Sequence, residues 1–369
     1  MVTRKNILII AGEKSGEDHL MSFFPLLKRK FENYDFWGVG GDEAEAKGVE
    51  LLFHLKNFGS MGISDVLGKI PFYFSAMDKI VKNAIKKNTE AAILIDFQDF
   101  NLRLAKRLSD EGVKVFYYVA PQAWVWRPSR VKKLIKYTDH LFCILPFERK
   151  WFSDRGVKNV SSVLHPVYRK IDAENRWPNK NYPKEELLLL PGSRNSEVLK
   201  TLPVFLDAIS TIDHGLKVSI VKTTSVRADV YEKYCDRISK FYDSKDLYDA
   251  LKEARFCLAA SGTATLSCAL MGVPTIVGYK VSLLNELFYR VFVPYKGLIA
   301  LANLIAEEEV FPELIQDRFN VFEINRKLSS WLANHNTVDE ITKKTCLVRD
   351  KFLFENEDVV DTIFKKMQK

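Results

Sequence analysis

The sequence predicts an α/β protein with two doubly wound domains, each a parallel sheet covered by helices on both faces. Short apolar runs alternate with amphipathic segments along most of the chain, a pattern typical of strands that alternate with helices. The length of 369 residues is more than one ordinary domain needs. A polar, proline-containing stretch at 168–186 predicts a linker, which leaves domains at 1–167 and 187–369. Two such domains would place a ligand cleft between the carboxyl ends of their sheets.

Strands are predicted where a short apolar run stands between turn signals. In the first half these runs are Asn6–Ala11, Asp35–Val39, Ala91–Asp96, Val113–Val119 and Leu141–Leu145. In the second half they are Leu187–Leu190, Lys217–Val221, Phe256–Ala260 and Thr275–Tyr279. Helical patterns lie between them, for example Phe100–Ser109, Leu247–Ala254 and Thr265–Met271. After Asn320 only helices are predicted, which close the second domain with room to pack back on the first.

The composition is that of an ordinary globular protein, with 47% hydrophobic and 28% charged residues. The five cysteines form no C-x-x-C pair, so neither a disulfide framework nor a zinc site is predicted, and a reducing cytosol fits best. The apolar run Ile7–Ala11 is too short for a signal peptide. No segment approaches the roughly 18 uncharged residues that a membrane span needs, so we expect no crossing of the bilayer.

Positive charge is concentrated in two places, within a formal net charge of +8. One is the run from Arg127 to Thr138, which has no acidic residue, and the other is a group of lysines at 79–87 that follows the apolar residues 70–74. Solvated helix faces are the ordinary explanation for such runs. Apolar and aromatic residues beside lysines also match a surface that rests on an anionic membrane. Nucleic acid ranks last, because no nucleic-acid motif accompanies the charge.

Two loops of the second half have the pattern of phosphate sites. Each follows an apolar strand, is rich in small residues and opens a helix, so backbone N–H groups at a helix N-terminus would face an anion. The planar side chain of Arg194 in the first loop also suits bidentate phosphate binding. Together the loops predict a ligand that carries a diphosphate. Their residues are Gly192, Ser193 and Arg194, and Ser261, Gly262 and Thr263.

The loop after the first strand, Ala11–Asp18, is rich in small residues but lacks the G-x-G-x-x-G pattern. No acidic residue ends the second strand, where a dinucleotide ribose would need one, so NAD and FAD are not expected. Ser15 and Gly16 open the next helix. Helix capping and contact with a ligand explain this pair equally well.

Asp96 ends an apolar strand at the edge of the sheet where a ligand would lie. A carboxylate there can take the proton of a sugar hydroxyl as that hydroxyl attacks. The alternative is a carboxylate satisfied by neighbouring backbone N–H groups, and we favour the general base. Asp99 is instead expected to cap the helix that begins near Phe100.

The segment 118–127 follows another strand and carries Trp124 and Trp126. The two tryptophans fit a core as well as a wall of an acceptor site, where aromatic rings stack on sugars and arginine pairs with phosphate. The candidates for the acceptor side of the cleft are Ser15, Gly16, Gln122, Trp124 and Arg127.

The histidines show no catalytic arrangement. His165, next to Pro166 at the domain boundary, is expected to be structural, and His19 to lie at the surface. No group of side chains has metal-ligand spacing, so neither a metal nor a cofactor is predicted.

Many of these segments together resemble the lipid-A-disaccharide synthase family, over about residues 7–316. Their order along the chain makes the resemblance specific, since any one of them would be weak. The matching segments are AGEKSG at 11–16, GVGG at 38–41, MGISDVL at 61–67, IDFQDFNLRLAK at 95–106, YVAPQAWVWRPSR at 118–130, LPFE at 145–148, His165-Pro166, LPGSRNSE at 190–197, ASGTATL at 260–266, Tyr279-Lys280, and Asn303–Ala306 with Pro312–Gln316.

The resemblance implies an inverting glycosyltransferase of the GT-B type, with two facing Rossmann-like domains. Such an enzyme joins UDP-2,3-diacylglucosamine to 2,3-diacylglucosamine 1-phosphate, giving the β(1→6) disaccharide 1-phosphate of lipid A and UDP, without a metal or cofactor. Asp96 matches the family's essential aspartate, the base for the acceptor hydroxyl. Arg194 matches its essential phosphate-loop arginine, and Asn303 and Gln316 match the UDP site. Both substrates are acylated, so the resemblance implies a cytoplasmic protein at the inner face of the cytoplasmic membrane. The basic and aromatic surface would then contact that membrane.

The chain departs from the family pattern at three positions. Gln98 stands where proline is usual, Glu17 where aspartate is common, and Ser267 where glutamate follows Ala-Thr-Leu. In related transferases that glutamate holds the ribose hydroxyls, and serine is too short to do so in the same way. One of the acidic residues Glu307–Glu309 could take its place.

Two other functions fit the same outline. A UDP-sugar 2-epimerase would share the fold but take a soluble sugar, and would release UDP without an acylated acceptor. A nucleotide-binding protein of the membrane surface would bind vesicles and UDP without forming product, with Ser267 as a sign of lost catalysis. A homodimer is compatible with the sequence, but no residue requires one.

Overall fold

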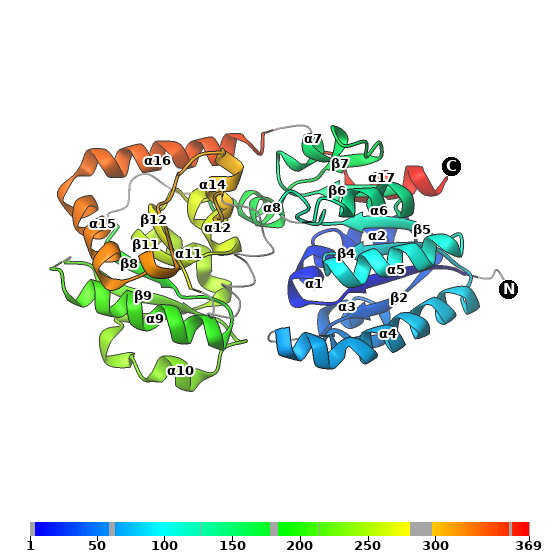
Figure 1. The fold of residues 1–369 in the computed structure, drawn as a ribbon, viewed down its shortest axis with the longest axis horizontal. Helices are drawn as coiled ribbons and strands as arrows, with labels where there is room; N and C mark the ends of the chain where they lie inside the picture. The colour runs from blue at the N-terminus through cyan, green and yellow to red at the C-terminus, as the bar shows by residue number, and fades with distance from the viewer. Residues whose placement is uncertain are drawn as a thin grey trace. The chain divides into compact units, whose positions relative to one another are not determined.

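The computed structural model of the chain describes residues 4–58, 63–125, 127–177, 184–213, 215–280, 297–353 and 356–368, with backbone alone at 63–67. The chain divides into two compact units (Figure 1). The first consists of Met1–Pro166 together with Glu355–Lys369, and the second of Val167–Phe354.

The unit boundaries correct the predicted domain limits at both ends of the second half. The segment 168–186, predicted as a linker, belongs to the second unit and begins within helix α8 (Pro166–Ala173). Tyr168 of that helix is buried against Phe352, with ring centroids 5.3 Å apart, which ties the segment to the second unit. The last residues, 355–369, belong to the first unit instead of ending the second.

The first unit is built on a seven-stranded parallel sheet in the order β3-β2-β1-β4-β5-β6-β7. Each strand predicted for this half is present, and β3 and β7 are additional. β3 lies at the sheet edge and is only partly buried, while β7 has three residues, so neither forms a long apolar run. The strands are β1 (Lys5–Ala11), β2 (Tyr34–Gly40), β3 (Val49–His54), β4 (Thr89–Ile95), β5 (Lys114–Tyr118), β6 (His140–Cys143) and β7 (Val160–Ser162).

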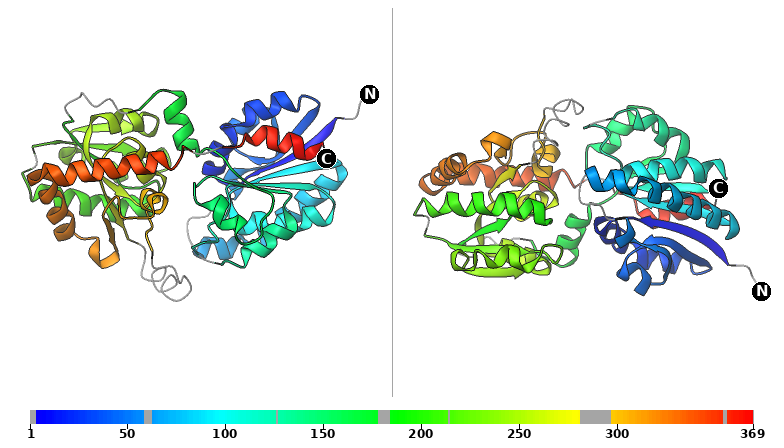
Figure 2. Two further views of the ribbon diagram at one scale, coloured as in Figure 1. Left: turned by 90° about the horizontal axis from the view of Figure 1, so that it is seen from above. Right: turned by 60° about the horizontal axis from the view of Figure 1, so that its bottom comes forward.

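Helices cover both faces of this sheet. Ile7 and Ile9 of β1 point to one face and Leu8 and Ile10 to the other, and all are fully buried. Leu8 and Ile10 belong to a core that includes side chains of α4, α5 and α6, whereas α2 and α17 pack together (Figure 2). The helices of the unit are α1 (Lys14–Met21), α2 (Phe24–Lys30), α3 (Asp42–Ala46), α4 (Ile63–Lys86), α5 (Gln98–Asp110), α6 (Arg130–Tyr137), α7 (Glu148–Ser153) and α17 (Val359–Met367).

The second unit repeats the plan with a six-stranded parallel sheet in the order β10-β9-β8-β11-β12-β13. The strands predicted for this half are present, with β10 and β13 in addition. The strands are β8 (Glu186–Leu190), β9 (Lys217–Lys222), β10 (Lys240–Asp243), β11 (Ala254–Ala260), β12 (Thr275–Tyr279) and β13 (Glu313–Ile315). Besides α8, the α-helices among the described residues of this unit are α9 (Asn195–Ser210), α10 (Ala228–Glu232), α11 (Leu247–Glu253), α12 (Thr263–Leu270), α14 (Leu301–Ala306), α15 (Val321–Ala333) and α16 (His335–Asp350).

The helices after Asn320 are divided between the units. α15 packs on α9 and α16 on α12, which closes the second unit as predicted. α17 returns to the first unit, where the rings of Phe31 and Phe364 lie 5.6 Å apart and Lys30 pairs with Asp361 at 3.1 Å. The C-terminal helix therefore completes the core of the unit in which the chain begins.

Each sheet reverses its strand order at one place. In the first unit the reversal falls between β1 and β4, and in the second between β8 and β11. The crossover connections leave these neighbouring strands in opposite directions, so the loops at their carboxyl ends part and leave room for a ligand. Four of the loops singled out in the sequence follow these four strands, and a fifth, 118–127, follows β5.

Candidate active site

The loop that carries Asp96 has an unusual backbone. Asp96 and Phe97, after β4, have φ angles of 49° and 47°, and Val119, after β5, has a φ of 69°. A β-branched residue rarely adopts this left-handed conformation, which is costly unless the surroundings enforce it. The Asp96 N–H donates to the carbonyl of Tyr118 at 2.9 Å, and the Asn101 side chain donates to the Asp96 carbonyl at 2.7 Å. The neighbouring strand and helix thus hold Asp96 at the carboxyl edge of the sheet.

The Asp96 carboxyl group is an unusually good proton acceptor. Burial, and after it the nearby charge of Glu13, raise its pKa to about 6 against the opposing hydrogen bond of the Phe97 N–H. A carboxylate with such a pKa is ionised near neutral pH and still binds a proton more readily than an ordinary aspartate. This environment fits the predicted general base.

Asp99 does not cap helix α5, contrary to the prediction. The residue before the helix is Phe97, and no side chain accepts a capping hydrogen bond. Asp99 pairs instead with Arg130 at 2.8 Å and with Arg127 at 3.4 Å. The second nitrogen of Arg130 donates to Gln98 Oε1 at 2.6 Å.

Arg130 is a site residue that sequence reasoning missed. It lies within the basic run after Arg127, where solvated lysines are the usual expectation, but it is buried while Lys132 and Lys133 are exposed. The 3.6-residue period of α6 turns Arg130 inward with Val131 and Leu134. Its bonds to Gln98 and Asp99 clamp the start of α5 next to Asp96.

Gln98 takes the place of a family proline without conflict. It is the first residue of α5, a position where proline is favoured because its missing N–H is not needed there. The glutamine side chain adds the bond from Arg130.

The loop after β1 packs against the Asp96 loop. A Cβ atom on Gly12 would lie 2.9 Å from the ring of Phe97, so the close approach requires glycine. Helix α1 begins after Glu13, and Ser15 is an exposed second residue, so Ser15 is not the helix cap. Gly16 is buried against the end of β4. Ligand contact by Ser15 stays a prediction.

Glu17 is buried and holds two helices together. Its Oε1 accepts N–H bonds from Gly41 at 2.8 Å and Ala44 at 3.0 Å, at the start of α3. Burial alone would raise the pKa of Glu17, but these N–H groups and Lys14 hold it below its usual value. The residue therefore braces α1 against α3 and does not face a ligand.

Trp124 is anchored by a buried acid. Its indole Nε1–H donates to Glu148 Oε1 at 3.1 Å, and the Leu145 N–H donates to the other oxygen at 3.1 Å. Burial raises the pKa of Glu148 to about 7 against the pull of these donors. Phe147 packs edge-on against Trp124 at 5.1 Å, so the indole is half-buried and held in place. Trp126 lies outside the described residues.

The other acceptor-side candidates lie at the surface. Gln122 and Arg127 are exposed, and Arg127 has a left-handed φ of 56°. His165 is buried, as expected of a structural residue, but His19 is half-buried instead of lying at the surface. Their rings meet edge-on at 6.3 Å, and burial lowers the pKa of His19 to about 4 and that of His165 to about 3.

In the second unit the two predicted phosphate loops lie side by side, because β8 and β11 are paired neighbours. Arg194 directly precedes α9 and its side chain is exposed. Ser261 and Gly262 precede α12 and Thr263 is its first residue. Gly262 and Thr263 are exposed, and nothing lies within 4 Å of a Cβ atom built on Gly262. Helix α12 has no acidic residue in its first turn to occupy its N–H groups. The arrangement fits an anion held between the loops.

Ser267 is turned into the interior. It is only 2% exposed, and its hydroxyl bonds with the buried Tyr248, whose pKa rises through burial against that bond. Glu307 and Glu308 pair at the surface with Lys351 at 3.3 Å and Lys344 at 2.8 Å of α16. A role of Glu307, Glu308 or Glu309 at the ribose stays a prediction.

Asn303 is a brace instead of a ligand contact, which corrects the prediction. It has no exposed surface. Its Oδ1 accepts the N–H groups of Val310 and Phe311, and its Nδ2 donates to the Phe311 carbonyl and to Glu313, all at 2.8–2.9 Å. The Glu313 carboxylate also accepts the N–H groups of Ile299 and Ala300 before α14. Gln316, at the carboxyl end of β13, has a left-handed φ of 53° and is partly exposed, so it stays a candidate.

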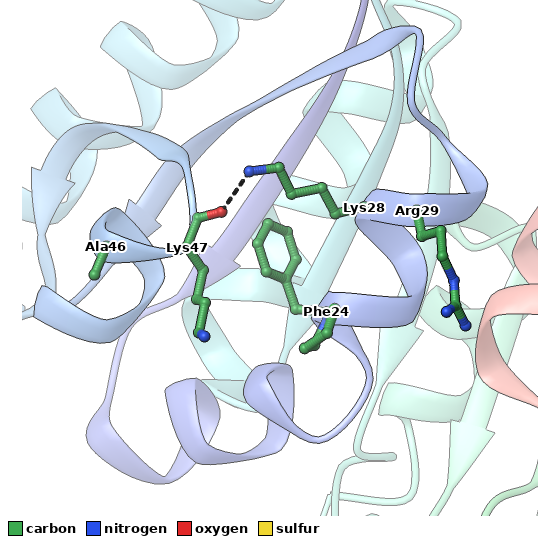
Figure 3. A pocket seen from close by; sticks show the side chains of 6 residues that line it. Phe24, Lys28, Arg29, Ala46 and Lys47 are labelled. Atoms are coloured by element: carbon green, nitrogen blue, oxygen red, sulfur yellow. Dashed lines mark hydrogen bonds between the residues drawn. The ribbon is translucent and has the colours of Figure 1, made fainter.

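A hollow of about 460 Å³ in the first unit is separate from this site. It lies between α2 and α3 and is lined by Phe24, Pro25, Lys28, Arg29, Ala46 and Lys47 (Figure 3). Both helices end there just before β2 and β3 begin, which places the hollow at the amino edge of the sheet, opposite Asp96. Lys28 Nζ donates to the Lys47 carbonyl at 2.8 Å, and so satisfies the end of α3.

A family model described as lipid-A-disaccharide synthetase matches residues 7–364. The chain belongs to the lipid-A-disaccharide synthetase family. Among curated relatives, the lipid-A-disaccharide synthase of Acidobacterium capsulatum is 31% identical, covering 99% of this chain and 96% of its own. The chain is therefore a glycosyltransferase of lipid A biosynthesis.

Solved structures support the GT-B fold of this family member. The calicheamicin glycosyltransferase CalG4 has a TM-score of 0.60 at 13% identity, over 100% of this chain and 99% of its own. A putative UDP-N-acetylglucosamine 2-epimerase from Listeria monocytogenes has a TM-score of 0.59 at 12% identity, over 93% and 91%. The fold is thus shared by transferases and epimerases, and it is the sequence family that favours the transferase. In the described part of the chain, no helix is both long and apolar enough to span a bilayer.

We expect Glu148→Leu to lower the free energy of unfolding by about 2–4 kcal/mol, because the N–H groups of Trp124 and Leu145 lose their acceptor. Chemical denaturation of the variant measures the change. Asp154→Asn, at the end of the same helix, is the control: its exposed pair with Lys150 is worth at most about 0.5 kcal/mol. Equal effects of the two substitutions would contradict a bracing role for Glu148.

Proposed function

We propose that this family member transfers 2,3-diacylglucosamine from UDP to the 6-hydroxyl of 2,3-diacylglucosamine 1-phosphate. A bond forms between the acceptor oxygen and C1 of the donor sugar, and the bond from C1 to the diphosphate breaks. The hydroxyl proton passes to a base and UDP leaves, so the reaction balances. The observation that carries the proposal is the family match over residues 7–364, supported by a synthase relative of nearly equal length.

Asp96 is the base in this proposal. Its place at the strand-order reversal, its enforced backbone and its pKa of about 6 suit a group that takes a proton near neutral pH. Arg130 holds the start of the following helix, and burial together with the charge of Glu13 keeps the pKa of the Asp96 carboxyl high. The exposed Arg127, Gln122 and Ser15, with Trp124 and Gly16, form the acceptor side, where Arg127 can pair with the acceptor phosphate.

The second unit holds the donor in this proposal. Arg194, with Gly192 and Ser193, and the N–H groups of Gly262 and Thr263 bind the diphosphate and offset the charge that develops on the leaving UDP. The Ser261 N–H donates to the Gly278 carbonyl at 3.1 Å, so Ser261 contributes its side chain and its place in the loop. Gln316 lies at the same edge of the sheet, at the end of β13. In this scheme the arginine and the backbone donors supply the stabilisation, and no metal or other cofactor takes part.

The acylated substrates place the enzyme at a membrane surface, and helix α4 suits that contact. Ile70 and Phe74 are 40% and 49% exposed on α4, and the same helix carries exposed lysines further along at 79, 82 and 86. Apolar side chains can enter the interface while the lysines meet anionic headgroups. We infer a peripheral association with the inner face of the cytoplasmic membrane.

Asp96→Asn is expected to lower turnover by about 10²–10⁴-fold, since the amide cannot take the hydroxyl proton. UDP binding should change less than about twofold, because Asp96 and the phosphate loops belong to different units. Mass spectrometry of the product from the two acylated substrates measures the loss. Asp110→Asn, at the far end of α5, is the matched control, with a loss below about twofold because its exposed pair with Lys106 is remote from the Asp96 loop. Full activity of Asp96→Asn would refute the assignment, and UDP release without the acylated acceptor would favour the epimerase.

The pH dependence of kcat/KM tests the same carboxyl group. The base must be ionised, so kcat/KM should fall on the acid side with an apparent pKa of about 6. Glu13→Gln removes a negative neighbour, which stabilises ionised Asp96 and should move this acid limb to lower pH. Glu13→Asp keeps the charge and is the control. If the acid limb of the kcat/KM profile of Glu13→Gln stayed in place or moved to higher pH, the result would count against Asp96 as the titrating group.

The double variant Ile70→Ser/Phe74→Ser tests the membrane surface. It should bind vesicles of phosphatidylcholine and phosphatidylglycerol at least about tenfold more weakly, because two apolar side chains no longer enter the interface. Co-sedimentation at low and high salt measures binding, and UDP affinity should not change. Phe322→Ser, at an exposed apolar residue of the second unit, serves as control. If the double variant and Phe322→Ser lost vesicle binding equally, the membrane contact would not lie on α4.

A further inference from the structure

The first phosphate loop of the second unit already contains an anion, the side chain of Glu197. Its Oε2 accepts the N–H of Ser193 at 3.0 Å, and its Oε1 accepts a bond from Arg194 Nη1 at 2.7 Å. A backbone N–H and a guanidinium are the two kinds of donor that a diphosphate needs from this loop. The carboxylate therefore occupies the donors that the proposed function assigns to the nucleotide.

The loop is shaped to receive this carboxylate. Gly192 has a φ of +127°, and a Cβ atom there would lie 2.7 Å from Glu197 Cβ and 2.8 Å from its Oε2. Only glycine permits both the backbone conformation and the close passage of the acid. The Thr201 hydroxyl bonds with the carbonyls of Pro191 and Glu197, which fixes the first turn of α9 beneath the loop. The contact is thus part of the loop's construction.

Helix capping does not account for this contact. Glu197 is the third residue of α9, and in a capping box it would accept the N–H of the residue that precedes the helix, Arg194. It accepts the N–H of Ser193, one residue earlier, and it also binds the Arg194 side chain. Both bonds point into the loop.

The carboxylate can be displaced. The side chains of Arg194 and Glu197 are 65% and 32% exposed, so water screens their attraction. A diphosphate carries more charge and more acceptor oxygens than a carboxylate, and it can engage Arg194 with two parallel bonds. A single Ser193 N–H cannot make full bonds to both anions, and two anions in one loop repel each other.

We propose that Glu197 is a stand-in for the donor diphosphate: it keeps the loop and Arg194 in place when the site is empty, and the diphosphate displaces it. This inference rests on the proposed function, because it takes the diphosphate to bind this loop. Glu197 is then a positioning residue that weakens nucleotide binding through competition. The same competition helps to expel UDP after transfer, when the carboxylate returns to the Ser193 N–H and Arg194.

The test is calorimetric titration of Glu197→Gln with UDP, UMP and uridine. The amide keeps the shape of the side chain but loses the charge that competes, so UDP should bind about tenfold more tightly, as expected for loss of one charge-assisted bond. The gain in affinity should be smaller for UMP and absent for uridine, because only the phosphate groups of the ligand compete with Glu197 for the loop. A purely structural role would alter all ligands alike.

Glu323→Gln is the matched control. Glu323 is also the third residue of its helix, α15, and it pairs with Arg326 at 2.7 Å within the same unit. The variant should bind UDP like the wild type. Thermal unfolding of both variants separates a folding defect from a change at the loop.

Unchanged or weaker UDP binding by folded Glu197→Gln would overturn the stand-in role, and weaker binding would show that the carboxylate only supports Arg194. Arg194→Ala distinguishes this failure from failure of the proposed function. If Arg194→Ala loses UDP while Glu197→Gln is unchanged, the donor site stands and the role of Glu197 falls. If the wild type does not bind UDP, or Arg194→Ala binds it equally well, both proposals fail.

Discussion

Burial of both faces of each parallel sheet is the constraint on which the rest of the molecule depends. Residues 7–10 of β1 and 187–189 of β8 have no exposed surface, so the faces of these central strands offer no polar group to a ligand. Polar chemistry is confined to the strand ends. At the carboxyl ends the reversal of strand order parts the loops, and there each unit carries its candidate residues. The same arrangement thus arises twice, in two halves that share no sequence motif.

The carboxyl edges of the two sheets differ in their electrostatics. In the first unit Asp96 and Glu148 are carboxyl groups whose pKa values burial raises, so this edge favours proton uptake. In the second unit the loops present N–H groups and the exposed Arg194, so that edge favours an anion, and the Glu197 carboxylate binds to part of it. A transfer with a leaving diphosphate needs both properties: a proton acceptor for the nucleophile and an anion site for the departing group.

Sequence patterns predict most of this fold because central strands are buried on both faces and read as apolar runs. The strands that the patterns miss, β3, β7, β10 and β13, are short or lie toward the sheet edges, where burial is partial. The return of α17 to the first unit also escapes prediction, because an amphipathic helix has the same pattern whichever surface it covers.

The site was predictable where a residue type and a strand end coincide, as at Asp96 and Arg194. The site was not predictable at residues where the sequence shows only a charged residue and gives no sign of its surroundings. Arg130 stands among solvated basic residues, and only the packing of α6 turns it inward. Glu197 follows its loop as an ordinary helix-start acid, and only the path of the Gly192 backbone brings the carboxylate onto the Ser193 N–H.

Several polar residues within the family segments hold loops instead of facing ligands. Glu17 accepts the N–H groups that begin α3, Glu148 those of Leu145 and Trp124, and Asn303 those of Val310 and Phe311. Each is buried and saturated with internal bonds, so its removal would leave several N–H groups unpaired and let a loop move. The groups left to meet a substrate are largely backbone donors and exposed arginines. The position of a backbone donor depends on the loop that carries it, so the braces fix the site's geometry without contacting what it binds.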